Sequence, residues 1–450
     1  MHCKKINAVI TAFFSMLIII PGSGHSLTLQ EAVLAASVYD SEISAARNAQ
    51  RAESQKRWQG LASLLPVVSL NGSYMKQDQP GATYAAGVTR HNYSVNLTQP
   101  LFDIAKFAAW KRGDAIAHYA DVALMLAEQK LIANVAEAYF HVIYQREVLK
   151  SAINAKAAYA KQLNQTEVAL QVGEGTRLER DEAQANYDRA VADEIAAKND
   201  LQEAGVIFTR LTGGNPNEIQ PVSLSCAIRI PVSDDVKALQ QQAGKNNLQV
   251  RAALFQLEQN KADFIAAQGA HLPVVTLQAG YGTNWSRAED SNLLDRVFGT
   301  TSKTRSSNIG INVSIPLFAG GSQISQSVEA TRRREQGKDL LEDARRKARQ
   351  ETQSAWLKLK NGRSQYLAEK KALASASNKV KSTAYGRKVG LRTIIDELNA
   401  QQEYYKTLQT LAKVQYDYLN TRLKLSMQLG ELDYSQLDIF QCVSDNKSVN

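Results

Sequence analysis

The sequence predicts an α+β protein in which two pairs of β-strands are joined to very long helices. Residues 101–215 and 317–450 contain no proline and are rich in strong helix formers. Four short segments elsewhere alternate apolar and polar side chains, as strands with two different faces do. The chain is also duplicated, because three motifs recur in one order at an offset of about 215 residues. The recurring pairs are 65–70 with 272–277, 100–102 with 316–318, and 175–185 with 390–400.

Residues 1–26 have the composition of a cleaved signal peptide. Lys4 and Lys5 precede an apolar stretch at 8–20, and small residues follow at 24 and 26. A short membrane anchor is the alternative, but the apolar stretch is shorter than a spanning helix needs. We therefore expect an exported protein.

Two cysteines, Cys226 and Cys442, remain after removal of the signal peptide, and each follows one half of the duplication. In an oxidising compartment they could form a disulfide. Two unpaired thiols in separate peripheral segments are the alternative, because a disulfide requires the two Cα atoms to lie close together. Both interpretations stay open at this point.

The proline-free stretches are too long for ordinary globular helices. From Asp103 to Val172 the chain would form a helix about 105 Å long at 1.5 Å per residue. Apolar residues such as Leu131, Val135 and Ala138 recur at spacings of three and four. This spacing predicts coiled-coil-like packing against neighbouring helices. One helical scaffold rod explains the stretch equally well.

The four alternating segments are 68–74, 92–98, 275–281 and 308–315. Each has an apolar face and a face of small or polar residues, as strands of a water-filled membrane barrel have. A half-buried soluble sheet has the same alternation and is commoner. Four strands cannot close a membrane barrel, and an open sheet would expose unpaired backbone groups to lipid. If the sheet spans a membrane, several chains must build the barrel, and three would supply twelve strands.

Composition argues against several classes of function. The net charge is +9, but Lys and Arg are scattered among acidic residues as on solvated helix faces, so no nucleic-acid partner is expected. After the signal peptide the histidines lack metal-ligand spacing, and no phosphate-binding loop or nucleophile motif occurs. We therefore expect no enzyme activity, no metal and no cofactor. These histidines are His91, His118, His141 and His271.

Taken together, these motifs resemble the TolC family of outer-membrane efflux and export channels. The resemblance covers residues 27 to about 432 and rests on 65–70, 99–103, 136–140 and both Gly–Asp motifs of the duplication. It implies a homotrimer in which four strands per chain form a twelve-stranded barrel in the outer membrane, surrounded by lipid. The barrel would continue into a helical coiled-coil tunnel in the periplasm.

The same resemblance implies a passive exit duct for type I protein secretion, multidrug efflux or both. A periplasmic adaptor and an inner-membrane pump of the ABC or RND type would open its gate. The segments expected after the signal peptide are a periplasmic helical segment (27–63), barrel hairpin 1 (64–102), periplasmic helices with a tip turn near 173–181 (103–212), an equatorial segment (213–235), a second helical segment (236–270), barrel hairpin 2 (271–318), helices with a tip turn near 387–396 (319–431), and an equatorial tail (432–450).

Glycines interrupt the long helices at the two points where the chain must reverse. An ordinary helix-hairpin turn explains them. The resemblance also implies that Gly173, Gly175, Val389, Gly390 and Leu391 receive the helical hairpin of an adaptor, since small residues allow a partner helix to approach closely. An ordinary helix-hairpin turn and an adaptor contact explain these residues equally well.

The resemblance assigns the pore constriction to Asp396 and Asn399. Family members carry a second acid one helical turn after the first, and this chain has Asn399 there. In a trimer, Asp396 would form a ring of carboxylates that favours cations. Glu397 lies about 100° further around the helix and is expected to face elsewhere.

A gate latch is implied at Asp181, Arg387 and Arg392. Polar links between the two tip turns keep the family's entrance shut, and Arg387 stands where the best-known members have an aromatic hydroxyl. Charge-assisted bonds from the two arginines to Asp181 would hold the gate. Ordinary exposed ion pairs, each contributing about 0–1 kcal/mol, are the alternative.

A periplasmic coiled-coil adaptor or scaffold is the competing function. Adaptors have one helical hairpin flanked by small β domains, whereas this chain has two predicted hairpin turns and four alternating strands.

Overall fold

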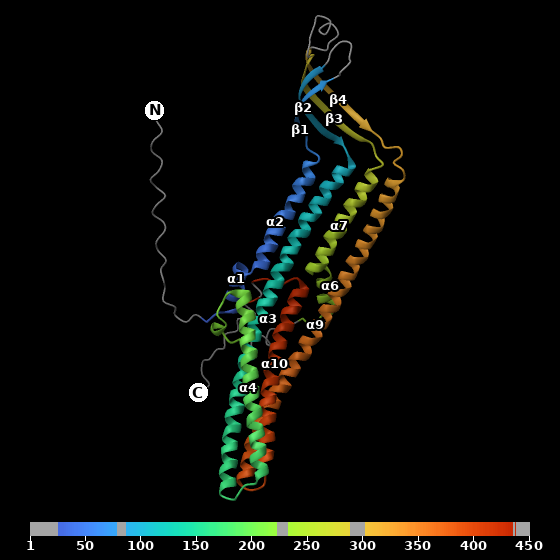
Figure 1. Cartoon of the computed structure of the whole chain (residues 1–450). Coiled ribbons are helices and arrows are strands. Elements are labelled where there is room, and N and C mark those ends of the chain that lie inside the picture. The colour runs from blue at the N-terminus through green and yellow to red at the C-terminus, as the bar shows by residue number, and fades with distance from the viewer. Residues whose placement is uncertain (1–25, 79–86, 223–232, 289–301, 435–436, 438–450) are drawn as a thin grey trace, which may run out of the picture.

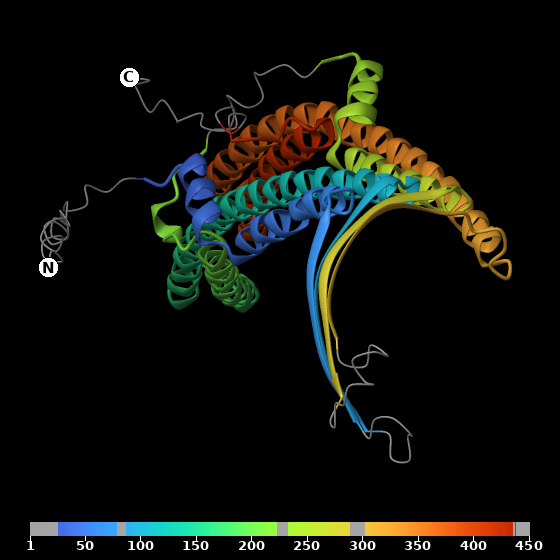
Figure 2. The same cartoon turned by 90° about the horizontal axis from the view of Figure 1, so that it is seen from above.

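The computed structural model describes residues 26–78, 87–222, 233–288, 302–434 and 437. Over these residues the chain is an elongated rod, with a β-sheet at one end and two helical turns at the other (Figure 1). Viewed from above, the sheet is a curved strip that extends away from the helices (Figure 2). Cys226 and Cys442 lie outside the described residues, as does nearly all of the predicted signal peptide.

Four strands form one antiparallel sheet in the order β1-β2-β3-β4. They are β1 Val67–Asp78, β2 Gly87–Phe102, β3 Val274–Ala288 and β4 Ser302–Ser314. β2 and β3 pair directly, with Val95 opposite Tyr281, although they come from different repeats. Strands β1 and β4 each keep one edge without a strand partner among the described residues. The sheet therefore joins the two halves of the duplication and ends in two open edges.

The two faces of the sheet differ as the alternation predicts. Leu70, Val95 and Tyr281 share one cross-strand row, and they are 76%, 44% and 56% exposed. The other face carries rows of small and polar residues, such as Asn96, Gly280 and Asn308. Among the described residues no layer covers the apolar face, because the helices continue from the end of the sheet rather than packing across it (Figures 1 and 2). Burying large exposed side chains of this kind requires lipid or another protein surface.

Two helices run most of the length of the rod. Helix α3 spans Ile104–Gln171 and helix α9 spans Ser322–Lys388, so each is about 100 Å long at 1.5 Å per residue. The side chain of Asp103 caps α3 by accepting a hydrogen bond from the backbone N–H of Lys106. Neither helix contains proline, so the backbone hydrogen bonds continue without a break.

Shorter helices pack along the two long ones. Near the sheet, α2 (Ser41–Ala62) lies beside α3, and α7 (Leu248–Gly269) lies between α3 and α9. Towards the far end, α4 (Arg177–Thr212) returns along α3 and α10 (Ile394–Leu429) returns along α9. Helices α1 (Leu29–Tyr39) and α6 (Val236–Asn246) and the short helix η1 (Pro216–Glu218) lie near the middle (Figure 1). Among the described helices, none is long and apolar enough to cross a membrane.

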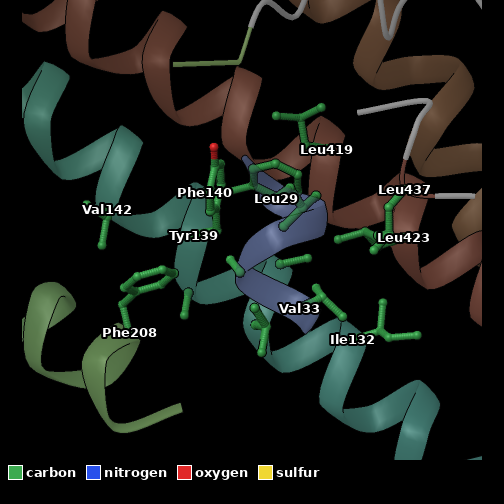
Figure 3. Close-up of a cluster of buried hydrophobic side chains, with 14 of the residues drawn as sticks. Leu29, Val33, Ile132, Tyr139, Phe140, Val142, Phe208, Leu419, Leu423 and Leu437 are labelled. Atoms are coloured by element: carbon green, nitrogen blue, oxygen red, sulfur yellow. The ribbon is translucent and has the colours of Figure 1, made fainter. Parts of the chain in front are cut away.

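The largest hydrophobic core lies in the middle of the rod, where residues of α1, α2, α3, α4, α9 and α10 meet. Leu29 and Val33 of α1 pack against Tyr139 and Phe140 of α3, with further side chains from α4 and α10 (Figure 3). Phe140 is 1% exposed and Val33 is fully buried. This core fixes the start of the described chain to both long hairpins.

A buried tyrosine anchors the start of the described chain and the segment that follows α4. The hydroxyl of Tyr139 lies 2.9 Å from the carbonyl oxygen of Leu27 and 2.8 Å from that of Gln220, and it can donate to either. Leu27 and Ile219 form an isolated parallel bridge beside it. Burial raises the pKa of the Tyr139 phenol, so the group stays a neutral donor at physiological pH.

Candidate functional site

Both chain reversals lie at the end of the rod farthest from the sheet (Figure 1). One turn joins α3 to α4 and the other joins α9 to α10. The structure brings these turns to one level because Tyr159 of α3, Ala190 of α4 and Leu398 of α10 form a small core above them. We refer to the two turns and the adjoining helix ends as the tip.

The two turns have the same backbone construction. Gly173 has φ 78° and Gly390 has φ 76°, in the left-handed region that favours glycine. The next backbone N–H donates back across the turn in both cases, from Glu174 to Ala169 O at 2.9 Å and from Leu391 to Gly386 O at 2.8 Å. This pattern is the Schellman motif, which satisfies the last carbonyl groups of a helix.

The following helices also begin in the same way. Thr176 and Glu179 form a capping box at the start of α4, and Thr393 and Asp396 form one at the start of α10. The left-handed glycines and the capping residues are all 217 positions apart in the chain. Glu179 is therefore the structural counterpart of Asp396. The motif pairing that set Asp181 against Asp396 is wrong by two residues at the tip.

Asp396 is held by Thr393. Its Oδ2 accepts hydrogen bonds from the backbone N–H and the hydroxyl of Thr393, at 3.0 Å each. These bonds, with a smaller contribution from the charge of Arg392, lower the pKa of the Asp396 carboxyl. The Asp396 carboxylate is thus anionic at neutral pH. Its other oxygen, Oδ1, takes no part in the capping box.

Asp396 and Asn399 lie on the less buried face of α10. Asn399 is exposed and Asp396 is half-buried, whereas Glu397 and Leu398 between them are buried. Because residues three apart lie on one side of a helix, both predicted constriction residues face away from the rest of the chain.

Arg387 forms a polar cluster with two residues that the motifs did not indicate. Its guanidinium group pairs with the carboxylate of Glu397 and donates to Oε1 of Gln165 at 3.1 Å. The side chain of Glu397 is 8% exposed and that of Arg387 is 29% exposed. Arg387 therefore connects both helices of the second hairpin, α9 and α10, to helix α3 of the first.

The predicted latch residues do not form one cluster within the chain. Asp181 pairs with its neighbour Arg180 at 2.9 Å. Arg392 is exposed, and its Cγ lies 2.8 Å from the point where a Cβ on Gly386 would stand. Among the described residues, no ion pair connects Asp181 with Arg387 or Arg392.

The predicted docking residues lie on the outer surface of the tip. Leu391 is 80% exposed and Val389 is 48% exposed. A Cβ placed on Gly173 or Gly390 would meet no heavy atom within 4 Å, whereas one on Gly175 would lie 3.1 Å from Ala169. The tip thus presents two apolar side chains beside open glycine backbone.

Comparison with known proteins identifies relatives of the whole chain. The family model described as "Outer membrane efflux protein" matches residues 35–214 and 239–431. The chain is 29% identical to Outer membrane protein TolC of Escherichia coli, covering 83% of this chain and 76% of that protein. It is 28% identical to Alkaline protease secretion protein AprF of Pseudomonas aeruginosa, covering 95% and 89%.

Solved structures share the fold. The outer membrane protein VceC of Vibrio cholerae superposes with a TM-score of 0.75 at 17% identity, covering 89% of this chain and 96% of that one. The CmeC outer membrane channel of Campylobacter jejuni gives a TM-score of 0.75 at 17% identity, covering 93% and 90%. The sheet and the long helices are thus arranged as in outer membrane channels.

Proposed function

Because the chain belongs to the outer membrane efflux protein family, we propose that it is the outer-membrane exit duct of a tripartite export system. It is an outer membrane protein of the efflux and protein-secretion class. In this proposal the chain is a passive conduit without a catalytic step, and its tip is a gate opened by an adaptor and an inner-membrane pump.

One observation carries this proposal: a sheet with an uncovered apolar face and two open edges continues into helices about 100 Å long. The apolar face suits lipid, and the polar face suits a water-filled lumen. An open strand edge in lipid would leave backbone N–H and C=O groups without hydrogen-bond partners. In this proposal β4 of one copy therefore pairs with β1 of the next. Three copies supply twelve strands, which supports a homotrimer.

Asp396 and Asn399 are our candidates for the constriction of the tunnel. Threefold symmetry would bring three Asp396 carboxylates around one axis, and the Thr393 hydrogen bonds, which favour the charged form of the carboxyl, support a negative ring. A ring of this kind raises the local concentration of cations. Asn399 adds polarity without charge one turn further along.

The latch is best divided into two parts. Arg387 holds Glu397 and Gln165 inside one chain, which supports a role in fixing the second hairpin to the first. Arg392 is exposed, and Asp181 is 63% exposed, so both are available to a neighbouring copy. We assign the Arg392–Asp181 link to the contact between protomers.

The exposed tip is our candidate for the adaptor contact. Val389 and Leu391 offer apolar area, and Gly173 and Gly390 leave the backbone open to a partner helix. The inner-membrane pump, of the ABC or RND type, would supply the energy. Protein secretion and efflux both need a test, because secretion protein AprF matches 95% of this chain and the outer membrane efflux protein BepC of Brucella suis matches 97%.

The test has two measurements on the full-length protein. Membrane fractionation followed by size analysis in mild detergent should find a trimer in the outer membrane. In planar bilayers the trimer should conduct cations in preference to anions. A monomeric periplasmic protein without conductance would instead support the adaptor or scaffold alternative.

The secretion route is tested separately in a deletion strain. Loss of an exported protein from the medium, restored by the gene, would support secretion, whereas sensitivity to small toxic compounds alone would support efflux.

A further inference from the structure

An aromatic row crosses the apolar face of the sheet near the end that is farthest from the helices. Tyr74 of β1 lies opposite His91 of β2, which lies opposite Trp285 of β3. The ring centroids of Tyr74 and His91 are 4.9 Å apart, and those of His91 and Trp285 are 4.8 Å apart. Aromatic side chains gather at the boundary between hydrocarbon and headgroups. The row therefore marks one limit of the apolar band.

The distance along the strand agrees with this assignment. The apolar face of β3 runs from Val275 to Trp285, ten residues later. At about 3.3 Å per residue and a tilt of about 40°, these residues cover about 25 Å of membrane thickness, the height of the apolar band in outer-membrane barrels. Because the helices leave the other end of the sheet, the aromatic row lies at the outer leaflet.

Besides Lys76 of β1, which shares a row with Thr89 and Arg287, three cations of β3 and β4 lie at and beside this row on the same face. Lys303 of β4 is directly opposite Trp285, and Arg305 is opposite Thr283. Arg287 lies two residues beyond Trp285, so alternation places it on the face of Trp285 as well. All three are exposed. Arg287 and Lys303 are diagonal neighbours on adjacent strands, about 7–8 Å apart, and Lys303 and Arg305 are successive residues on the same face of β4. A headgroup with two separated phosphates can therefore reach all three.

Charge on the rest of the sheet does not offset this cluster. Asp78, the one acidic residue in the described strands, lies on β1 and is separated from β3 by β2. On the opposite face at this level, Arg90 lies in one row with Ser286 and Ser302. The cluster of Arg287, Lys303 and Arg305 is therefore a local feature of the lipid-facing surface.

We propose that Arg287, Lys303 and Arg305 bind the phosphate groups of a phosphorylated glycolipid in the outer leaflet. The inference rests on the proposed membrane placement and adds a specific lipid partner to it. Arginine forks bind phosphate oxygens in pairs, and lysine adds a point charge beside them. Trp285 and His91 adjoin the site, where the sugar ring and the first acyl carbons of such a lipid would lie. Arg305 lies one row closer to the hydrocarbon, and its long side chain can extend to the headgroups.

The experiment compares two variants of the full-length trimer in neutral detergent. One carries Arg287→Gln, Lys303→Gln and Arg305→Gln together, and the matched control is Arg90→Gln, which removes a cation of the same sheet level from the other face. The probe is diphosphorylated lipid A in mixed micelles, with inorganic phosphate as competitor. Trimer content and bilayer conductance are measured on every variant.

We expect the triple variant to bind the lipid at least tenfold more weakly and to lose the salt dependence of binding, whereas Arg90→Gln stays within twofold of the parent. Equal binding by the triple variant, an equal loss in Arg90→Gln, or complete competition by millimolar phosphate would overturn the inference. If the parent conducts but does not bind the lipid, this inference alone fails. Absence of trimer and conductance in the parent would refute the proposed function itself.

Discussion

Replacing Glu397 with glutamine should loosen the closed tip. The change keeps the shape of the side chain but leaves the Arg387 guanidinium without its counter-charge. Breaking a buried ion pair costs about 3–5 kcal/mol, and exposed pairs contribute about 0–1 kcal/mol. Arg387 is 29% exposed and glutamine can still accept a hydrogen bond, so we expect a loss of about 2 kcal/mol between these limits. At 1.36 kcal/mol per factor of ten, the closed state would lose about 30-fold in population.

Planar-bilayer recording measures this change directly, and the same pair of helices provides a control. Lys379 of α9 and Glu403 of α10 form an ion pair at 2.5 Å, but both side chains are 54% exposed. Glu397→Gln should raise the mean conductance and the frequency of open events, whereas Glu403→Gln should leave both unchanged. A double-mutant cycle with Arg387→Gln should give a coupling energy above about 1 kcal/mol, and one with Lys379→Gln should give almost none.

The reasoning is refuted if Glu397→Gln and Glu403→Gln behave alike in both measurements. It is also refuted if Gln165→Ala, which removes the acceptor on α3, has no effect while Glu397→Gln opens the channel. In that case Arg387 would stabilise only its own hairpin.

Other outcomes follow from the same geometry. Arg392→Ser should raise single-channel conductance in bilayers, and unchanged conductance would remove Arg392 from the latch. Asp396→Asn should abolish cation preference. In the parent the Thr393 hydrogen bonds lower the Asp396 pKa, so the cation preference should persist at neutral and mildly acidic pH. The carboxylate should lose its charge, with its stabilising contribution, only as pH falls through the lowered pKa. Thr393→Val removes the hydroxyl donor, so the loss of selectivity should move to higher pH. Gly390→Ala forces a side chain into φ 76° at a cost of about 1–2 kcal/mol, which should appear as faster hydrogen exchange at the tip, whereas Gly310→Ala should have no such effect there.

Much of the fold could be predicted from local patterns. Strand alternation located all four strands, because a face in contact with lipid and a face in contact with water impose a period of two. Absence of proline at 101–215 and 317–450 predicted the long helices, and α3 and α9 begin within these ranges at Ile104 and Ser322. These signals are local, so a single sequence carries them.

The tip could be predicted only in part, because its chemistry depends on aligning the two repeats to the exact residue. Aligning Gly175 with Gly390 matched residue letters, whereas the chain reversal needs the left-handed glycine at 173. Glu397 was expected to face away from the side of Asp396, and it is buried against Arg387, a contact that the motifs did not indicate. A usable signal was present: Arg387 and Glu397 lie almost symmetrically about Leu391, as Lys379 and Glu403 do, and such positions face each other in a helical hairpin.

The pairing of β2 with β3 has a consequence for the order of folding. The central ladder of the sheet joins a strand of the first repeat to a strand of the second, so it cannot form until nearly two thirds of the chain has crossed the inner membrane. Until then the β1–β2 hairpin would carry an apolar face and an unpaired edge in water, where such surfaces aggregate. Contacts this distant in sequence also form slowly. The interval between synthesis of the two repeats is therefore when the chain most needs a holding chaperone.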